Sequence, residues 1–104
     1  MSETAPERIT VVVDEMLAQL IPTFLGNVET SLKAIAERLE AGDFVEVAGI
    51  GHRLKGSGGA YGFEPITRHG GRIEQAGKDG DAATARRELA ELESYVSRVD
   101  VVYD

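Results

Sequence analysis

The sequence contains no cysteine and no tryptophan, and aromatic residues make up only 6% of it. Without cysteine, the chain can form neither a disulfide nor a thiolate metal site. With so few aromatic side chains, a buried core has to be built from aliphatic residues and alanine. That composition favours helices over sheets.

Positive charge is also in short supply, with 11 Lys and Arg residues against 18 Asp and Glu, which leaves a net charge of -7. This balance argues against nucleic acid and against an anionic membrane surface as partners. No apolar run approaches the roughly 20 residues that span a bilayer. Residues 1–8 lack the apolar centre of a signal peptide. We therefore expect a soluble, cytoplasmic protein.

The chain has 104 residues, which suffice for one domain with a modest core. We expect residues 1–13 to form an N-terminal tail or a short extended segment, and residues 14–104 to form the folded domain. Residues 9–13 and 99–103 are similar β-branched runs and are strand-like in composition. Either these runs pair where the termini meet, or they are extended ends or the last turn of a helix.

Apolar residues that recur every three or four positions predict a series of amphipathic helices. Asp14 suits the N-cap of a short first helix, and Pro22 suits the first turn of the next one. Gly42 and Gly80, each followed by aspartate, are stop signals with a cap for the following helix. The pattern predicts an all-α fold, an antiparallel four-helix bundle with a short extra N-terminal helix. The predicted helices cover residues 14–20, about 22–41, 44–60, 64–78 and 82–98.

The stretch from His52 to Phe63 holds one of the two histidines and four of the twelve glycines. A glycine inside a helix costs about 1 kcal/mol relative to alanine, so bare backbone beside a histidine needs a reason. At about 100° per residue, His52 falls roughly 140° from the centre of the apolar face of its helix and should reach solvent. The expected buried face consists of Phe44, Val47, Gly51, Leu54, Gly58 and Tyr61. The stripe that contains His52 also holds Ala48, Lys55, Gly56 and Gly59.

This stripe has the chemistry that phosphoryl transfer requires. An exposed imidazole is largely neutral at pH 7, so that one ring nitrogen is a free nucleophile. Lys55, one turn away, can stabilise negative charge on a group that the ring receives, and small residues allow another backbone to approach. Such transfer depends mainly on positioning and charge stabilisation. The alternative is a surface histidine without a role, followed by a glycine loop.

Other phosphate and metal chemistries do not fit the same residues. A Walker loop needs Gly-Lys-Ser/Thr after its spacer, whereas Lys55 precedes the glycines. The dinucleotide-binding fingerprint fails because position 61 is tyrosine. Two histidines without cysteine make a weak zinc site. We therefore expect no cofactor, no metal ligands and no kinase or nucleotide-hydrolysing activity.

Residues 52–57, His-Arg-Leu-Lys-Gly-Ser, followed by Tyr-Gly-Phe at 61–63, resemble the signature of histidine-containing phosphotransfer (HPt) domains. Weaker similarity extends over nearly the whole chain, at residues 21–25, 41–44, 73–76 and 80–81. The resemblance implies a four-helix bundle in a two-component phosphorelay. Its histidine would accept a phosphoryl group from a receiver-domain phospho-aspartate, or from a kinase, and pass it to another receiver domain.

The resemblance also implies the partners. They would be response-regulator receiver domains, a hybrid sensor histidine kinase, or both, and magnesium would be supplied by the receiver domain. Nothing in the sequence signals dimerisation, so we expect a monomer. A function of a different class remains open, namely a helical docking module that binds a signalling partner without carrying phosphate.

Single residues can be assigned from the same resemblance. His52 would be the phosphoacceptor, Lys55 would lie beside the phosphoryl group, and Gly56 would leave room for that group and for the partner. Glu74 matches a position where some members, notably the phosphotransfer domains of chemotaxis kinases, have a glutamate bonded to the other ring nitrogen. Such a bond would fix the tautomer of the ring. The alternative for Glu74 is a solvated glutamate on a helix.

Partner docking is assigned to Ala48, Arg53, Gly59 and Arg72. We expect Arg53, Arg68 and Arg72 to ring the site, where they would attract the acidic residues around a receiver's aspartate. Alternatively, each arginine is only a charge on a solvated face. The second histidine, His69, matches no catalytic position of the family and is expected at the surface or facing a partner.

Overall fold

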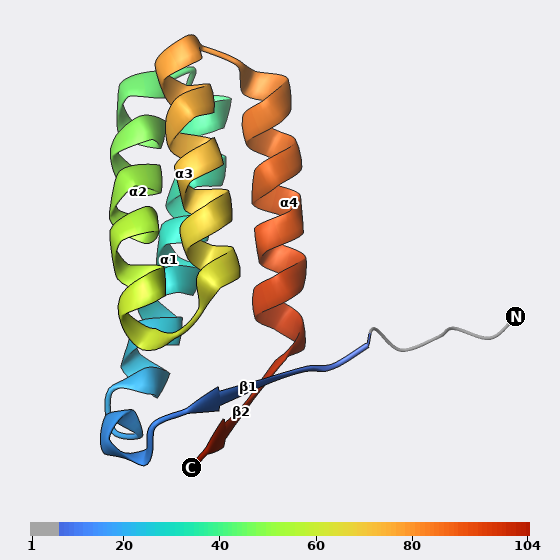
Figure 1. The fold of residues 1–104 in the computed structure, drawn as a ribbon. Coiled ribbons are helices and arrows are strands. Elements are labelled where there is room, and N and C mark those ends of the chain that lie inside the picture. Colours follow the sequence, from blue (N-terminus) through green and yellow to red (C-terminus); the bar gives the residue numbers. More distant parts are fainter. Residues whose placement is uncertain (1–6) are drawn as a thin grey trace, which may run out of the picture.

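The computed structural model describes residues 7–104, and it confirms the prediction of an all-α fold with four helices (Figure 1). Short turns join consecutive helices, and the chain reverses direction at each of these turns in Figure 1. Residues 1–6 of the expected N-terminal tail lie outside the described residues. No helix within residues 7–104 is long and apolar enough to cross a membrane. The helices are α1 (Ile21–Glu40), α2 (Phe44–Gly58), α3 (Glu64–Asp79) and α4 (Ala82–Arg98).

Local signals in the sequence set the helix boundaries. The side chains of Asp43 and Asp81 accept hydrogen bonds from the backbone N–H groups of Glu46 and Thr84, and so cap α2 and α4. Gly42, Gly62 and Gly80 have φ angles of 70°, 89° and 66°, in the left-handed region that favours glycine. These three residues lie in the turns that separate the four helices.

The segment before α1 is shorter than predicted. A helix was expected over residues 14–20, and the structure has one turn of 3-10 helix, Glu15–Leu17, capped by the side chain of Asp14. Residues 18–20 form a turn that leads directly into α1 at Ile21. A second 3-10 turn, Gly59–Tyr61, follows α2.

The two β-branched runs at the ends of the chain pair with each other. Strand β1 (Ile9–Val13) lies parallel to β2 (Val99–Tyr103), with Ile9 opposite Val99 and Val13 opposite Tyr103. Val13 is buried, and the alternate residues Ile9, Val11, Val99 and Val101 pack against the core. The structure thereby decides between the two alternatives that the composition left open.

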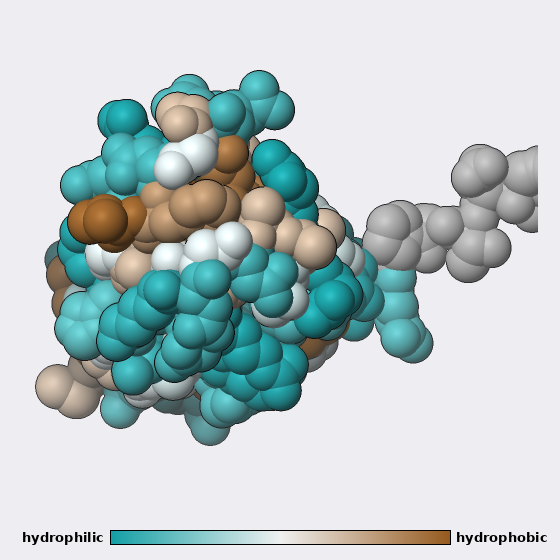
Figure 2. All heavy atoms as spheres, turned by 90° about the horizontal axis from the view of Figure 1, so that it is seen from above, coloured by the Kyte–Doolittle hydropathy of each residue, from teal (hydrophilic) through white to brown (hydrophobic). Residues whose placement is uncertain are grey.

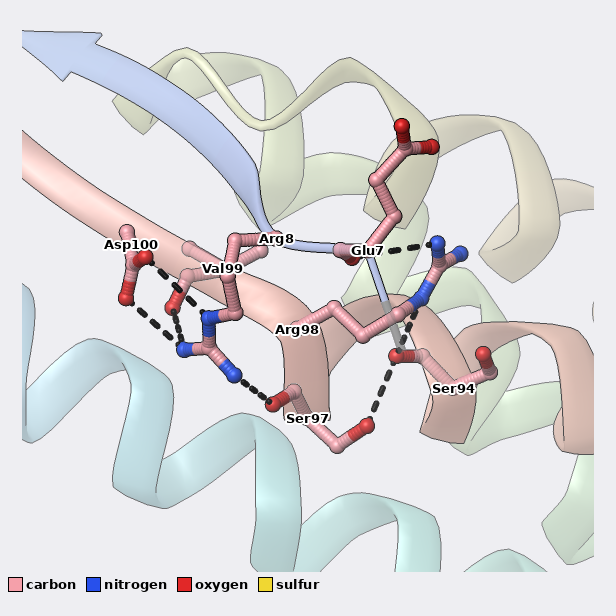
Figure 3. A network of polar contacts seen from close by, with 7 residues as sticks. All are labelled: Glu7, Arg8, Ser94, Ser97, Arg98, Val99 and Asp100. Atoms are coloured by element: carbon pink, nitrogen blue, oxygen red, sulfur yellow. Dashed lines mark hydrogen bonds and ion pairs between the residues drawn. The ribbon is translucent and has the colours of Figure 1, made fainter. Parts of the chain in front are cut away.

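A polar network ties this strand pair to the end of α4 (Figure 3). The guanidinium of Arg8 donates to both carboxylate oxygens of Asp100, at 2.7 and 3.1 Å, and to the carbonyl oxygens of Ser97 and Val99. The hydrogen bond from Arg8 holds the pKa of Asp100 below its ordinary value. Since an exposed ion pair contributes little stability, we assign the network mainly a role in fixing the register of the strands.

Helices α2 and α3 approach until their backbones are in contact. A Cβ atom placed on Gly51 would lie 2.6 Å from the backbone nitrogen of Glu74, and one on Gly77 would lie 2.7 Å from the backbone nitrogen of Ala48. A Cβ atom on Gly70 would lie 2.7 Å from the backbone nitrogen of Lys55. Only glycine permits such an approach. The contact brings the α2 stripe of His52 next to α3.

The close approach predicts opposite effects for two glycine-to-alanine changes. Gly51→Ala should lower the free energy of unfolding by about 1–3 kcal/mol, because the new methyl group meets rigid backbone. Gly26→Ala, inside α1 with no atom within 4 Å of the new Cβ, should be neutral or stabilising by up to about 1 kcal/mol. Urea unfolding of both variants measures the difference. Equal effects in the two variants would contradict the backbone contact.

Candidate functional site

His52 lies on α2 with 68% of its side chain exposed, which confirms that it reaches solvent. The rotation of α2 is fixed by the opposite face, where Val47, Gly51 and Leu54 are buried against the core. The imidazole therefore projects from a rigid element, and its exposed side is open to a partner protein.

Glu74 lies behind the ring on α3. Its Oε2 atom is 3.1 Å from Nδ1 of His52, and only 12% of its side chain is exposed. Because a carboxylate can only accept a hydrogen bond, this contact places a proton on Nδ1. In the neutral ring, Nε2 then keeps its free lone pair. The arrangement leaves Nε2 as the ring nitrogen that can act as a nucleophile.

Two lysines share the same carboxylate. Nζ of Lys55, on α2, is 3.5 Å from Oε1 of Glu74, and Nζ of Lys78, on α3, is 3.3 Å from Oε2. Sequence reasoning assigned no role to Lys78. The signal for it was the spacing Glu74–Lys78, since residues at i and i+4 are neighbours on a helix surface.

Glu74 remains ionised because its cationic neighbours outweigh its partial burial. Burial by itself raises the pKa of this carboxyl group, but the hydrogen bond and charge of Lys78, the charge of Lys55 and the hydrogen bond from His52 together lower it below the ordinary value. The group therefore carries its negative charge at neutral pH, and it can hold the Nδ1 proton of His52.

The free space along the stripe that contains His52 differs between Gly56 and Gly59. A Cβ atom on Gly56 would have no neighbour within 4 Å, so this position is open. Gly59 is exposed, but a Cβ atom there would lie 3.4 Å from Oγ1 of Thr67. Of the two glycines assigned to this stripe, Gly56 is thus the one that leaves free room next to the histidine.

Ala48 lies at the other end of the stripe, where α2 meets Gly77 of α3. It is half-buried and lines a groove together with Phe44, Val45 and Gly77. Figure 2 views this end of the bundle and shows a hydrophobic band between hydrophilic residues. Val45, in the first turn of α2, is 82% exposed. Ala48 is therefore partly exposed at the surface and partly buried in the contact between α2 and α3.

The structure does not bring the three arginines into a ring around His52. Arg53 lines a groove between α1 and α2, whereas Arg72 lies 3.8 Å from Glu88 of α4 and Arg68 pairs with Glu64. Arg68 and Arg72 are four residues apart and share the side of α3 that turns toward α4. Glu74, two positions after Arg72, is rotated by about 200° and faces α2.

The expectation that His69 is a surface residue is wrong. His69 is 5% exposed, and its Nδ1 atom lies 2.6 Å from Oε1 of Glu88, which is also buried. The position follows from the periodicity of α3, because Ile66 and Ile73, three residues before and four after it, are buried as well. The hydrogen bond compensates both groups for the loss of water. The pair holds α3 against α4.

Removing one partner of the His69–Glu88 pair should destabilise the protein. Glu88→Ala leaves His69 buried without its acceptor, and we expect the free energy of unfolding to fall by about 3 kcal/mol. Glu93→Ala removes the same charge from an exposed position of α4 and should change it by less than about 0.5 kcal/mol. Thermal and urea unfolding compare the two variants. Similar losses of unfolding free energy in the two variants would show that the buried His69–Glu88 pair contributes no more to stability than an exposed glutamate does.

A helical bundle that presents one exposed histidine, backed by a carboxylate from the next helix, has the layout of a histidine phosphotransfer protein. The family model described as Hpt domain matches residues 6–101, and the chain belongs to this family. Membership implies histidine phosphotransfer in two-component phosphorelay signalling and interaction with receiver domains or kinases. The comparisons with curated proteins and with solved structures gave no match.

Proposed function

We propose that this protein is a phosphorelay intermediate that accepts a phosphoryl group on Nε2 of His52 from the phospho-aspartate of a receiver domain, or from a kinase, and passes it to another receiver domain. The observation that supports this most is the contact between Nδ1 of His52 and Oε2 of Glu74, at 3.1 Å, beneath an otherwise exposed ring. It orients the ring and leaves its outer nitrogen free.

In the proposed step, the lone pair of Nε2 attacks phosphorus in line. The bond from phosphorus to the aspartate oxygen breaks, and its electron pair returns to the aspartate carboxylate. The ring then carries a positive charge, because Nδ1 keeps its proton, and the Glu74 carboxylate stabilises that charge. Transfer to the next receiver reverses these events. Magnesium would be held by the receiver domain, and this chain would need no cofactor of its own.

The other site residues have distinct proposed roles. Lys55 would stabilise the charge of the phosphoryl group, and Gly56 would admit that group and the partner's backbone. Docking would involve Arg53, next to His52 on α2, and Gly59, in the 3-10 turn after α2, more than Ala48 and Arg72, which lie at helix contacts. Docking around a single exposed histidine suits a small, transient interface.

We also propose the finer features of the fold. Residues 14–104 would be an antiparallel HPt bundle with a short 3-10 turn in place of the extra N-terminal helix. Residues 1–13 would be an N-terminal segment that includes β1. The protein would work in the cytoplasm as a monomer.

The proposal predicts a phosphohistidine on one residue only. Incubation with a phosphorylated receiver domain, or with an active hybrid kinase, should give the protein acid-labile, alkali-stable label, and His52→Gln should abolish it. His69→Gln is the matched control, because its imidazole is buried and should take no part. Label on His52→Gln would show that the site assignment is wrong. Binding of the receiver without any label on the wild type would favour a docking module.

The open space at Gly56 predicts a steric block. Gly56→Leu should reduce transfer at least about tenfold, because the side chain fills the space that the phosphoryl group and the partner need. The circular dichroism should remain that of a folded helical protein, since the position is exposed. Gly26→Leu, in a similarly open place on α1, should leave transfer unchanged. Normal transfer by the Gly56 variant would rule out the steric role.

A further inference from the structure

The carboxylate of Glu74 is held by two lysines that reach it from different helices. Lys55 comes from α2, with its Nζ atom 3.5 Å from Oε1. Lys78 comes from α3, with its Nζ atom 3.3 Å from Oε2, the oxygen that also lies 3.1 Å from Nδ1 of His52. These two lysines and His52 are the charged or titratable groups of the described residues that face Glu74.

The lysines differ in the helix from which they reach Glu74. Lys78 follows Glu74 by four residues on the same helix, so the helix geometry keeps the two side chains adjacent. The order Glu then Lys is the more favourable one for such a pair. Water weakens an ordinary surface pair. In this pair the Lys78 side chain is 60% exposed, but the Glu74 side chain is only 12% exposed.

Lys55 can serve two groups. Its stem crosses Gly71 of α3, where an added Cβ would lie 3.2 Å from the lysine Cδ atom. It follows His52 by three residues on the same helix face, so its ammonium group can reach either Glu74 or a group carried by the ring. A bound phosphoryl group brings between one and two negative charges at neutral pH and competes with Glu74 for this lysine.

We propose that Lys78 is a positioning residue that keeps Glu74 ionised and in contact with Nδ1 of His52, and so frees Lys55 to move to the phosphoryl group. The role of Lys78 toward Glu74 concerns the unphosphorylated protein alone. The movement of Lys55 to the phosphoryl group rests on the proposed function. The carboxylate would lose much of its charge compensation if Lys55 left and no second cation remained. Lys78 supplies that cation throughout the transfer.

The first experiment needs no phosphate. Carbon-13 NMR follows the side-chain carboxyl of Glu74 in the wild type, Lys78→Gln, Lys78→Arg and Lys33→Gln, the last a matched loss of one exposed charge on α1. Because Lys78 lowers the pKa of Glu74, its removal should move the titration midpoint to higher pH. Lys78→Arg should restore the midpoint, and Lys33→Gln should leave it unchanged.

A second readout is the tautomer of His52. Nitrogen-15 shifts should show less of the Nδ1–H tautomer in Lys78→Gln, and in none of the other variants. An unchanged midpoint and tautomer in that variant would overturn the proposal.

The second experiment measures transfer from a phosphorylated receiver. Lys78→Gln should lower kcat about tenfold with KM nearly unchanged, because a displaced reacting group slows the chemical step. The acid limb of its pH profile should move to higher pH, and Lys78→Arg should recover most of the rate. Wild-type kcat in Lys78→Gln would overturn the role in transfer. If the wild type itself takes no label, the proposed function fails, and the NMR result still decides whether Lys78 positions Glu74.

Discussion

The contact between the backbones of α2 and α3 is the constraint on which the rest of the site depends. Gly51 and Gly70 have no side chains at the crossing, so the two helices lie closer than ordinary side chains allow. A glutamate side chain is short, and Glu74 reaches Nδ1 of His52 only because its own backbone touches α2. The glycines that are unfavourable for the isolated helices are therefore what place a carboxylate behind the histidine.

This dependence explains why part of the site could be predicted from the sequence. Helical periodicity places His52 opposite Val47, Gly51 and Leu54, and the structure has the same faces. The periodicity also divides the glycines into packed and open ones, and Gly51 and Gly56 indeed differ in this way. These features are local, because a single helix determines them.

Features that involve two helices were harder to predict. The spacing along α2 does not say which face of α3 it meets, so Arg72 was placed beside His52 although it turns toward α4. The periodicity of α3 indicates that His69 is buried, but it does not reveal the buried acceptor, Glu88 of α4, and the histidine was expected at the surface. The proposed role of Lys78 was missed because the sequence does not show that Lys55 and Lys78 meet at the same carboxylate.

The parallel pairing of the terminal strands also affects how the domain bears load. The N-terminal end of β1 and the C-terminal end of β2 lie at opposite ends of the ladder, because Ile9 faces Val99 and Val13 faces Tyr103. A force that pulls residues 9 and 103 apart would therefore shear the ladder and stress all its hydrogen bonds together, instead of opening them one after another. The helices that carry His52 and Glu74 lie between the two strands in the sequence, so this short ladder would shield the geometry of the site from tension on the chain.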